Sequence, residues 1–366
     1  MQTSKLLAAL GALAMSGWAQ PPASLAGPVT GFVFDNQPGA IRPMLGIPGA
    51  AYLGPAAATG LESASVAPDG SAALAVQRTG KLVLYTGLHG ASPVVLAVSG
   101  AVASPSLFAW AADGSAAAVY SARTGEGQML TGLAASPAAA APIDLASLPG
   151  PVAALACDGQ RLIVAVASAG GGGIGGIYLA GAPESGSAGL QLIAPAASPS
   201  AIALAGSSLF FSDSQAQQIL LVQNYASAPV AVVFANDSGI RSPAGLQVSA
   251  DGQRLFVANA GNRTLAVYDI ASRAPVASLD LAFTPTRLDR FGDASVFLMN
   301  GTGQGPLYVV RDGGAGKTAA VYFVPAPARH RPMRPRSGTR DAPGAEEEGL
   351  DGATLDTMRK AGRIAR

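Results

Sequence analysis

The clearest hydrophobic pattern in the chain lies between residues 245 and 281, where short apolar runs alternate with turn-forming residues. The runs are Gly245–Ser249, Leu255–Val257, Leu265–Tyr268 and Pro275–Leu281. They are rich in Leu, Val, Phe and Tyr, which favour strands. Asp251-Gly252 and Ala260-Gly261-Asn262 separate the first three runs with residues suited to tight turns. The pattern predicts four short strands joined by turns.

The Asp-Gly turn of this stretch recurs along the chain. It is found at Asp69-Gly70, Asp113-Gly114, Asp158-Gly159 and Asp251-Gly252, with spacings of 44, 45 and 93 residues, and 93 corresponds to two repeats. Weaker turns at Gly206-Ser207 and Gly292-Asp293 also precede strand-forming runs. Six repeats are expected to start near Leu61, Ser106, Val152, Ser200, Gly245 and Leu288. Four short strands per repeat of this length are typical of an all-β fold, the β-propeller, in which each blade packs against its neighbours.

The stretch from residue 28 to residue 60 leaves the number of blades open. Val29–Asp35 is interpreted as the third strand of a blade, Ala40–Ile47 as the fourth, and Gly49–Leu53 as an inner strand. The segment either completes a seventh blade or packs outside a ring of six, and we favour seven. The last repeat already contains four strand-forming runs, at Leu288–Phe291, Ser295–Asn300, Pro306–Arg311 and Ala319–Val324.

The stretch at residues 249–270 resembles the YVTN-type propeller repeat. The resemblance rests on Asp251-Gly252, on Phe256-Val257-Ala258-Asn259 and on Val267-Tyr268-Asp269. It covers one repeat clearly, and the other five share only its period. It implies a propeller fold and a secreted or surface location, and that family has no shared catalytic motif to transfer to this chain.

Residues 1–19 have the pattern of a signal peptide. Lys5 provides a positive start, Leu6–Met15 an apolar core and Gly17-Trp18-Ala19 a small-x-small cleavage site, so the mature chain would begin at Gln20. The alternative is a membrane anchor, but the apolar run is shorter than the roughly 20 residues that span a bilayer. We therefore expect an exported protein, periplasmic, on the cell surface or extracellular, with the propeller at residues 20–327 and no later transmembrane segment.

Residues 328–366 differ sharply from the repeats. The segment begins with Arg329, Arg331, Arg334, Arg336 and Arg340 among prolines and then becomes acidic from Glu346 to Asp356. It lacks the apolar residues needed for a core, so we expect a disordered tail. The arginines could tether the protein to an anionic surface, or the tail could simply be solvated.

Composition favours a large packed core and limits the partners. Hydrophobic residues make up 49% of the chain and charged residues 12%, against about 25% charged in typical domains. Residues 20–327 contain 13 basic and 16 acidic residues, a net charge of −3, so we expect no nucleic acid on the propeller. The single cysteine, Cys157, is interpreted as a small buried side chain.

Polar residues align at the end of the second strand of several repeats. Gln77, Ser121, Asp213, Asn259 and Asn300 take this position, with Arg78, Arg123 and Arg263 in the following loops and Arg287 before an inner strand. Such positions share one face of a propeller around the mouth of its channel, a usual place for a ligand. The alternative is that these side chains bond local backbone groups and stabilise turns.

Two function classes remain open at the level of sequence. The first is a binding or scaffold module, expected as a monomer, for a protein or an envelope polymer. The second is a propeller-type hydrolase or lactonase acting on a small sugar-like substrate. His89 and His330 are the only histidines, so we expect no metal site of the His/Cys kind, and no motif indicates a cofactor or a catalytic residue. The sequence therefore favours binding over catalysis.

Overall fold

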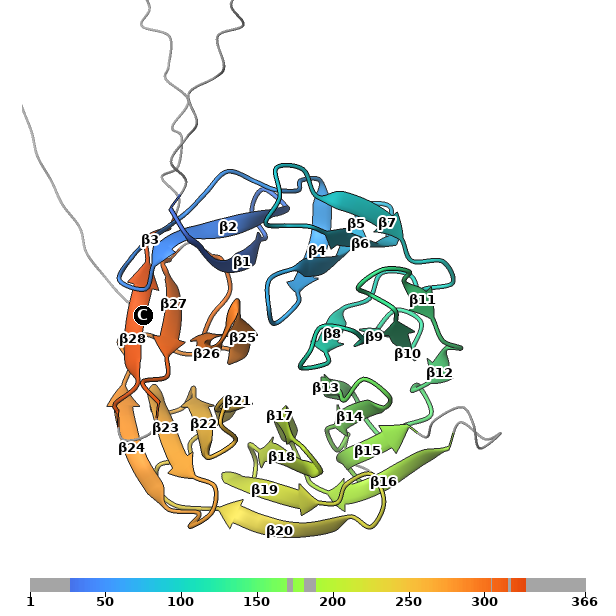
Figure 1. Ribbon diagram of the computed structural model, residues 1–366. Helices are drawn as coiled ribbons and strands as arrows, with labels where there is room; N and C mark the ends of the chain where they lie inside the picture. The colour runs from blue at the N-terminus through green and yellow to red at the C-terminus, as the bar shows by residue number, and fades with distance from the viewer. Residues whose placement is uncertain (1–26, 170–173, 181–188, 304, 315–316, 327–366) are drawn as a thin grey trace, which may run out of the picture. The chain divides into compact units, whose positions relative to one another are not determined.

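The computed structural model describes residues 27–169, 174–180, 189–303, 305–314 and 317–326. The predicted signal peptide and the predicted tail lie outside these residues. Within the described part of the chain, seven antiparallel sheets stand around a common axis, as Figure 1 shows. The chain folds as a seven-bladed β-propeller.

The blades follow one another in chain order. Blade 1 contains β1 (Val29–Asp35), β2 (Ala40–Ile47) and β3 (Ala50–Leu53). Blade 2 contains β4 (Leu61–Val66), β5 (Ala72–Gln77), β6 (Leu82–Thr86) and β7 (Val94–Ala97). Blade 3 contains β8 (Leu107–Trp110), β9 (Ala117–Ser121), β10 (Glu126–Thr131), β11 (Ala138–Ala139) and β12 (Ile143–Asp144). Blade 4 contains β13 (Val152–Cys157), β14 (Leu162–Val166), β15 (Gly176–Ala180) and β16 (Leu190–Pro195).

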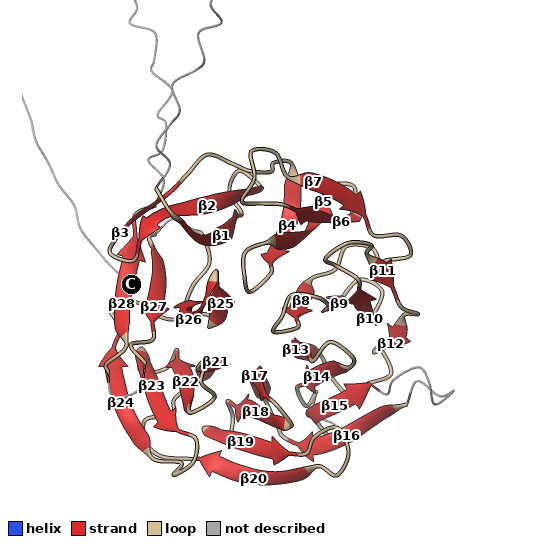
Figure 2. Cartoon of the chain, viewed as in Figure 1, coloured by secondary structure: helices blue, strands red, loops and turns tan. Residues whose placement is uncertain are grey.

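Blades 5 to 7 complete the ring. Blade 5 contains β17 (Pro199–Ala205), β18 (Ser208–Asp213), β19 (Gln218–Gln223) and β20 (Val230–Ala235). Blade 6 contains β21 (Pro243–Val248), β22 (Arg254–Asn259), β23 (Thr264–Asp269) and β24 (Pro275–Asp280). Blade 7 contains β25 (Asp289–Phe291), β26 (Asp293–Leu298), β27 (Leu307–Arg311) and β28 (Ala320–Val324). Figure 2 shows strands and loops only, and no described helix could span a membrane.

The predicted Asp-Gly turns join the first and second strands of their blades. Their glycines have φ values of 72° to 95°, a region that a side chain disfavours. In all four turns the aspartate Oδ1 accepts a hydrogen bond from the backbone N–H two residues later, at 2.8–3.0 Å. The weaker turns at Gly206 and Gly292 have φ values of 57° and 69°. All six predicted turns are therefore confirmed.

Blades 3 and 1 depart from the regular four-stranded blade. In blade 3, β11 and β12 both pair with β10, so together they replace one outer strand. Pro142 lies between them, and it has no N–H for the ladder. The described part of blade 1 has three strands in the order β1-β2-β3.

The interpretation of residues 28–60 was right about a seventh blade but wrong about its strand order. β3 contacts the outer strand β28, and β1 contacts the inner strands β4 and β25. Among the described strands of blade 1, Val29–Asp35 is therefore the innermost, and Ala50–Leu53 lies at the outer edge. The short apolar run at Ala50–Leu53 gave no sign of which edge it would take.

The hydrophobic core is divided among the interfaces between blades. Seven clusters of buried residues occur in the described chain, and each combines residues from two neighbouring blades. Phe210 of blade 5 packs with Leu255 and Tyr268 of blade 6, for example. Val33 and Met44 of blade 1 pack with Phe291 and Val309 of blade 7. The ring therefore closes by packing of blade 7 on blade 1, without exchange of a strand among the described residues.

Candidate functional site

The predicted site residues lie on one face of the ring. We call this the loop face, because the second strands end there and the loops to the third strands begin. Gln77, Ser121, Asp213 and Asn259 are the last residues of β5, β9, β18 and β22, and Asn300 follows β26 by two residues. The opposite face carries the Asp-Gly turns and is called the turn face.

Ser121 and Asp213 are buried and bonded to the chain that leads into their own blades. Ser121 Oγ donates a hydrogen bond to the Ala103 carbonyl at 2.8 Å. The Asp213 carboxylate, with the residue 3% exposed, accepts four backbone N–H bonds, from Ala197, Ser198, Gln215 and Ala216, at 3.0–3.2 Å. Both side chains thus hold the crossover between blades against the end of a second strand.

The two asparagines, in blades 6 and 7, each use both side-chain polar atoms in hydrogen bonds, with different partners. Asn259 Oδ1 accepts from the Arg241 N–H at 3.1 Å, and Nδ2 donates to Thr264 Oγ1 at 3.3 Å. Asn300 Oδ1 accepts from the Tyr308 N–H at 2.8 Å, and Nδ2 donates to the Pro306 carbonyl at 3.0 Å. Their polar atoms are therefore committed to local structure.

Three arginines are among the exposed residues of the loop face. Arg78, Arg123 and Arg263 are exposed, and none of them forms a hydrogen bond or ion pair through its side chain within the described part of the chain. They belong to blades 2, 3 and 6, so they do not converge on one point. Arg287 differs, because its Nε lies 3.2 Å from Asp289 Oδ2.

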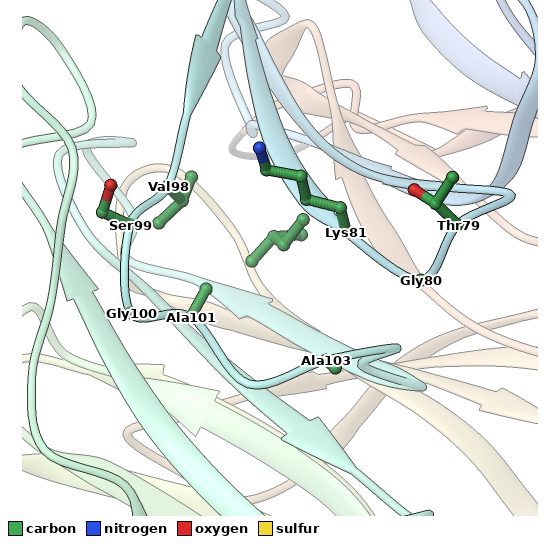
Figure 3. Close-up of a pocket in the computed structure, with 9 residues that line it drawn as sticks. Thr79, Gly80, Lys81, Val98, Ser99, Gly100, Ala101 and Ala103 are labelled. Carbon is green, nitrogen blue, oxygen red and sulfur yellow. The ribbon is translucent and has the colours of Figure 1, made fainter.

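A pocket on the loop face lies between blades 2 and 3. Its volume is about 340 Å³, and Thr79–Leu82, Val98–Ala101 and Ala103 line it. Figure 3 shows Lys81 extending between the two loops, with Val98 and Ser99 across from it. This volume is at the lower end for small-molecule sites. The pocket borders the predicted residues Gln77 and Arg78 but was not itself predicted.

Gln128 fixes one wall of this pocket. The residue is fully buried, its Oε1 accepts from the Val102 N–H at 2.8 Å, and its Nε2 donates to the carbonyls of Gly100 and Ala140 at 2.8 and 2.7 Å. The Ser104 N–H also donates to the Gly80 carbonyl at 2.9 Å and joins the two loops. The side-chain amide of Gln128 within the apolar run of β10 was the sequence signal that could have identified it as a structural residue.

Cys157 and His89 lie away from the loop face. Cys157 is 3% exposed, and burial raises the pKa of its thiol from 9.0 to about 11, so it stays protonated at neutral pH. His89 lies beside Phe32 and Gly70 on the turn face, with its ring 5.1 Å from that of Phe32. No group of three or more His, Cys, Asp or Glu residues in the described ranges could hold a metal ion.

Comparison with known proteins adds a fold but no family. No family model matches the chain, and no curated protein matches its sequence. Among solved structures, it is similar to a "putative 6-phosphogluconolactonase" from Bacteroides fragilis NCTC 9343, with a TM-score of 0.56, 12% identity, and coverage of 81% of this chain and 94% of that one. At this identity the likeness shows the β-propeller fold alone.

Two further structures are less similar. A chain of a nidogen/laminin complex gives a TM-score of 0.45 at 13% identity over 68% of this chain and 92% of that one. Kluyveromyces lactis Hsv2 gives 0.47 at 11% identity over 68% and 73%. The resemblance to the YVTN-type repeat receives no support from these comparisons and stays a prediction.

Proposed function

We propose that the protein is an exported binding module whose loop face holds a partner that carries carboxylates. The observation that carries this proposal is the contrast between the polar groups of that face. Asp213 and Asn259 are committed to backbone bonds, whereas Arg78, Arg123 and Arg263 are exposed and form no ion pair with any residue that the structure describes. A guanidinium group can bind a carboxylate through two parallel hydrogen bonds.

The rigidity of the loops supports this role. Gly125 N–H donates to the Ser121 carbonyl at 2.8 Å, which closes the turn that carries Arg123. Arg263 occupies a left-handed turn position, with φ of 55°. Because the loops are already ordered, a partner loses little free energy in fixing them.

The first experiment compares two sets of arginine variants. Arg78→Gln/Arg123→Gln/Arg263→Gln removes three exposed arginines of the loop face, and Arg273→Gln/Arg311→Gln, a control that removes two charges, replaces exposed arginines beside the turn face. The probes are immobilised poly-L-glutamate for an acidic protein and alginate for an acidic envelope polymer. We expect wild-type protein to bind at least one probe at low salt, and each lost cation to weaken binding by up to about 1 kcal/mol.

The outcome separates the two faces. Loss of binding on the order of tenfold in the triple variant, with the control close to wild type, supports the proposal. Equal binding by the triple variant and the wild type, or no binding to either probe by any form, contradicts it. Light scattering of the same samples tests the expected monomer.

The export part of the proposal has its own test. N-terminal sequencing of the protein recovered from the producing cell's exterior or periplasm should begin at Gln20. A cytoplasmic protein that retains Met1 would contradict it.

Hydrolysis of a small sugar-like lactone is the second candidate. Its support is the shared fold with the Bacteroides fragilis protein. Asp213 and Asn259, at the loop-face ends of β18 and β22, would supply oxygen atoms to the substrate site. Their committed hydrogen bonds make the candidate less favoured. Turnover on a panel of sugar lactones that disappears in Asp213→Ala, while the fold is kept, would overturn the binding assignment.

A further inference from the structure

The pocket between blades 2 and 3 has apolar walls that belong to the core. Leu82 and Val98 line it, and both are buried in the core cluster that these two blades share. Ala101 also lines the pocket and packs against the same cluster. The packing of the blades therefore fixes these walls, and they offer an apolar surface to the carbon skeleton of a ligand.

Two tight turns supply most of the remaining lining. In the β5–β6 turn the Gly80 N–H donates to the Gln77 carbonyl at 2.8 Å, and after β7 the Ala101 N–H donates to the Val98 carbonyl at 3.4 Å. Gly80 and Gly100 have φ values of 80° and 74°, which glycine adopts without strain. The pocket therefore has its shape before a ligand arrives, so binding does not require the turns to order.

Three polar side chains line the pocket without being used by the protein itself. Thr79, Lys81 and Ser99 are exposed, and their side chains form no hydrogen bond or ion pair with any residue that the structure describes. In Figure 3, Lys81 extends between the turn that carries Thr79 and the turn that carries Ser99. None of the described lining residues is acidic. The polar groups of this pocket are therefore available to a ligand.

The chemistry of these groups defines the ligand. The Lys81 ammonium only donates hydrogen bonds and carries a positive charge, so it favours a carboxylate. The hydroxyls of Thr79 and Ser99 both donate and accept, as the hydroxyls of a sugar do. The volume of about 340 Å³ is at the lower end for small-molecule sites, which suits a ligand of one sugar ring.

We propose that this pocket binds a small polyhydroxy carboxylate, such as a hexuronate. Lys81 binds its carboxylate, the hydroxyls of Thr79 and Ser99 bind its hydroxyls, and the apolar walls contact its ring carbons. This site is separate from the proposed function, because none of the three loop-face arginines lines the pocket.

A ligand-observed NMR titration with glucuronate tests the charge. Lys81→Met keeps the aliphatic chain and removes the ammonium, and Lys317→Met removes the same charge at an exposed position beside the turn face. We expect the wild type to bind glucuronate with a dissociation constant on the order of 1 mM. Lys81→Met should weaken binding on the order of tenfold, and Lys317→Met should bind as the wild type does.

Two comparison ligands and a second variant test the hydroxyls. Methyl glucoside lacks the charge and acetate lacks the hydroxyls, so each should bind on the order of tenfold more weakly than glucuronate. Thr79→Val/Ser99→Ala keeps Lys81 and should weaken glucuronate about fivefold while leaving acetate unchanged. Glucuronate should also slow hydrogen–deuterium exchange at residues 79–82 and 98–103 of the wild type.

The outcomes separate this site from the arginines. Equal glucuronate binding by the wild type and Lys81→Met, or no binding at concentrations on the order of 10 mM, would overturn the proposal. Weaker binding in the triple arginine variant, with Lys81→Met unaffected, would also overturn it and would assign the ligand to the arginines. The poly-L-glutamate and alginate experiment is read independently, since it compares variants that all keep Lys81.

Discussion

At the scale of single residues, buried charge joins neighbouring blades. Arg254 of β22 forms two parallel contacts with Asp312, Nη1 to Oδ1 at 2.7 Å and Nη2 to Oδ2 at 3.0 Å, and Nη1 also donates to the Gly314 carbonyl at 2.8 Å. The side chains are 12% and 4% exposed. This pair attaches blade 6 to the β27–β28 loop of blade 7.

Arg254→Ala should therefore lower the free energy of unfolding by about 3 kcal/mol, because it leaves the Asp312 carboxylate buried without its partner. Arg311→Ala, at an exposed position of blade 7, should change it by less than about 0.5 kcal/mol. Urea unfolding measures both. Equal effects of the two substitutions would show that the pair does not hold the blades.

Cys157 gives stability a pH dependence with a defined sign. Burial raises its thiol pKa from 9.0 to about 11, so the buried thiol resists ionisation and the unfolded chain ionises first. The protonated thiol therefore contributes fully to the free energy of unfolding below pH 9, and this contribution is lost as the pH rises to about 11. Over this pH range the free energy of unfolding of the wild type should fall by up to about 2 kcal/mol more than that of Cys157→Ala. Parallel pH profiles of the two proteins would contradict this.

At the scale of elements, the crossover between blades 2 and 3 depends on Gln128. Gln128→Ala should lower the free energy of unfolding by about 2–3 kcal/mol, since the Val102 N–H and the Gly100 and Ala140 carbonyls lose their buried partner. Hydrogen–deuterium exchange of the backbone amides of residues 98–104 should become faster in the same variant. Gln160→Ala, at an exposed turn position, is the control. An unchanged exchange pattern at residues 98–104 would contradict the role of Gln128.

Local signals explain why most elements could be predicted from the sequence. The Asp-Gly turns use contacts within three residues. Together with the two weaker turns, they placed the inner strands β4, β8, β13, β17 and β25 to within one residue and β21 to within two. Blade 1 was misjudged because its place depends on contacts with Gly292 and Thr302, more than 250 positions away. The Arg254–Asp312 pair and the pocket depend on distant contacts in the same way.

The candidate site was predictable in position but not in chemistry. Turn alignment put Ser121, Asp213, Asn259 and Asn300 at equivalent strand ends, where the structure also has them. Whether such a side chain faces solvent or a backbone amide depends on the neighbouring crossover, and the repeat pattern does not contain this information. Whether these residues or the arginines bind a ligand stays a prediction.

At the scale of the whole molecule, the ring is held closed by side chains from its two ends. Asn36 N–H donates to Thr302 Oγ1 at 3.1 Å, next to the core cluster shared by blades 1 and 7. Gly31 allows this approach, because a Cβ there would lie 2.7 Å from the Phe291 ring.

A disulfide between positions 36 and 302 measures closure directly. In Asn36→Cys/Thr302→Cys, the two thiols should lie within reach of a bond, and Cys157 is buried and unavailable. We expect the purified variant to oxidise to a single intramolecular disulfide, seen by non-reducing electrophoresis and peptide mass spectrometry, with a raised melting temperature. A folded variant whose two thiols remain free under oxidising conditions would contradict a closed seven-bladed ring.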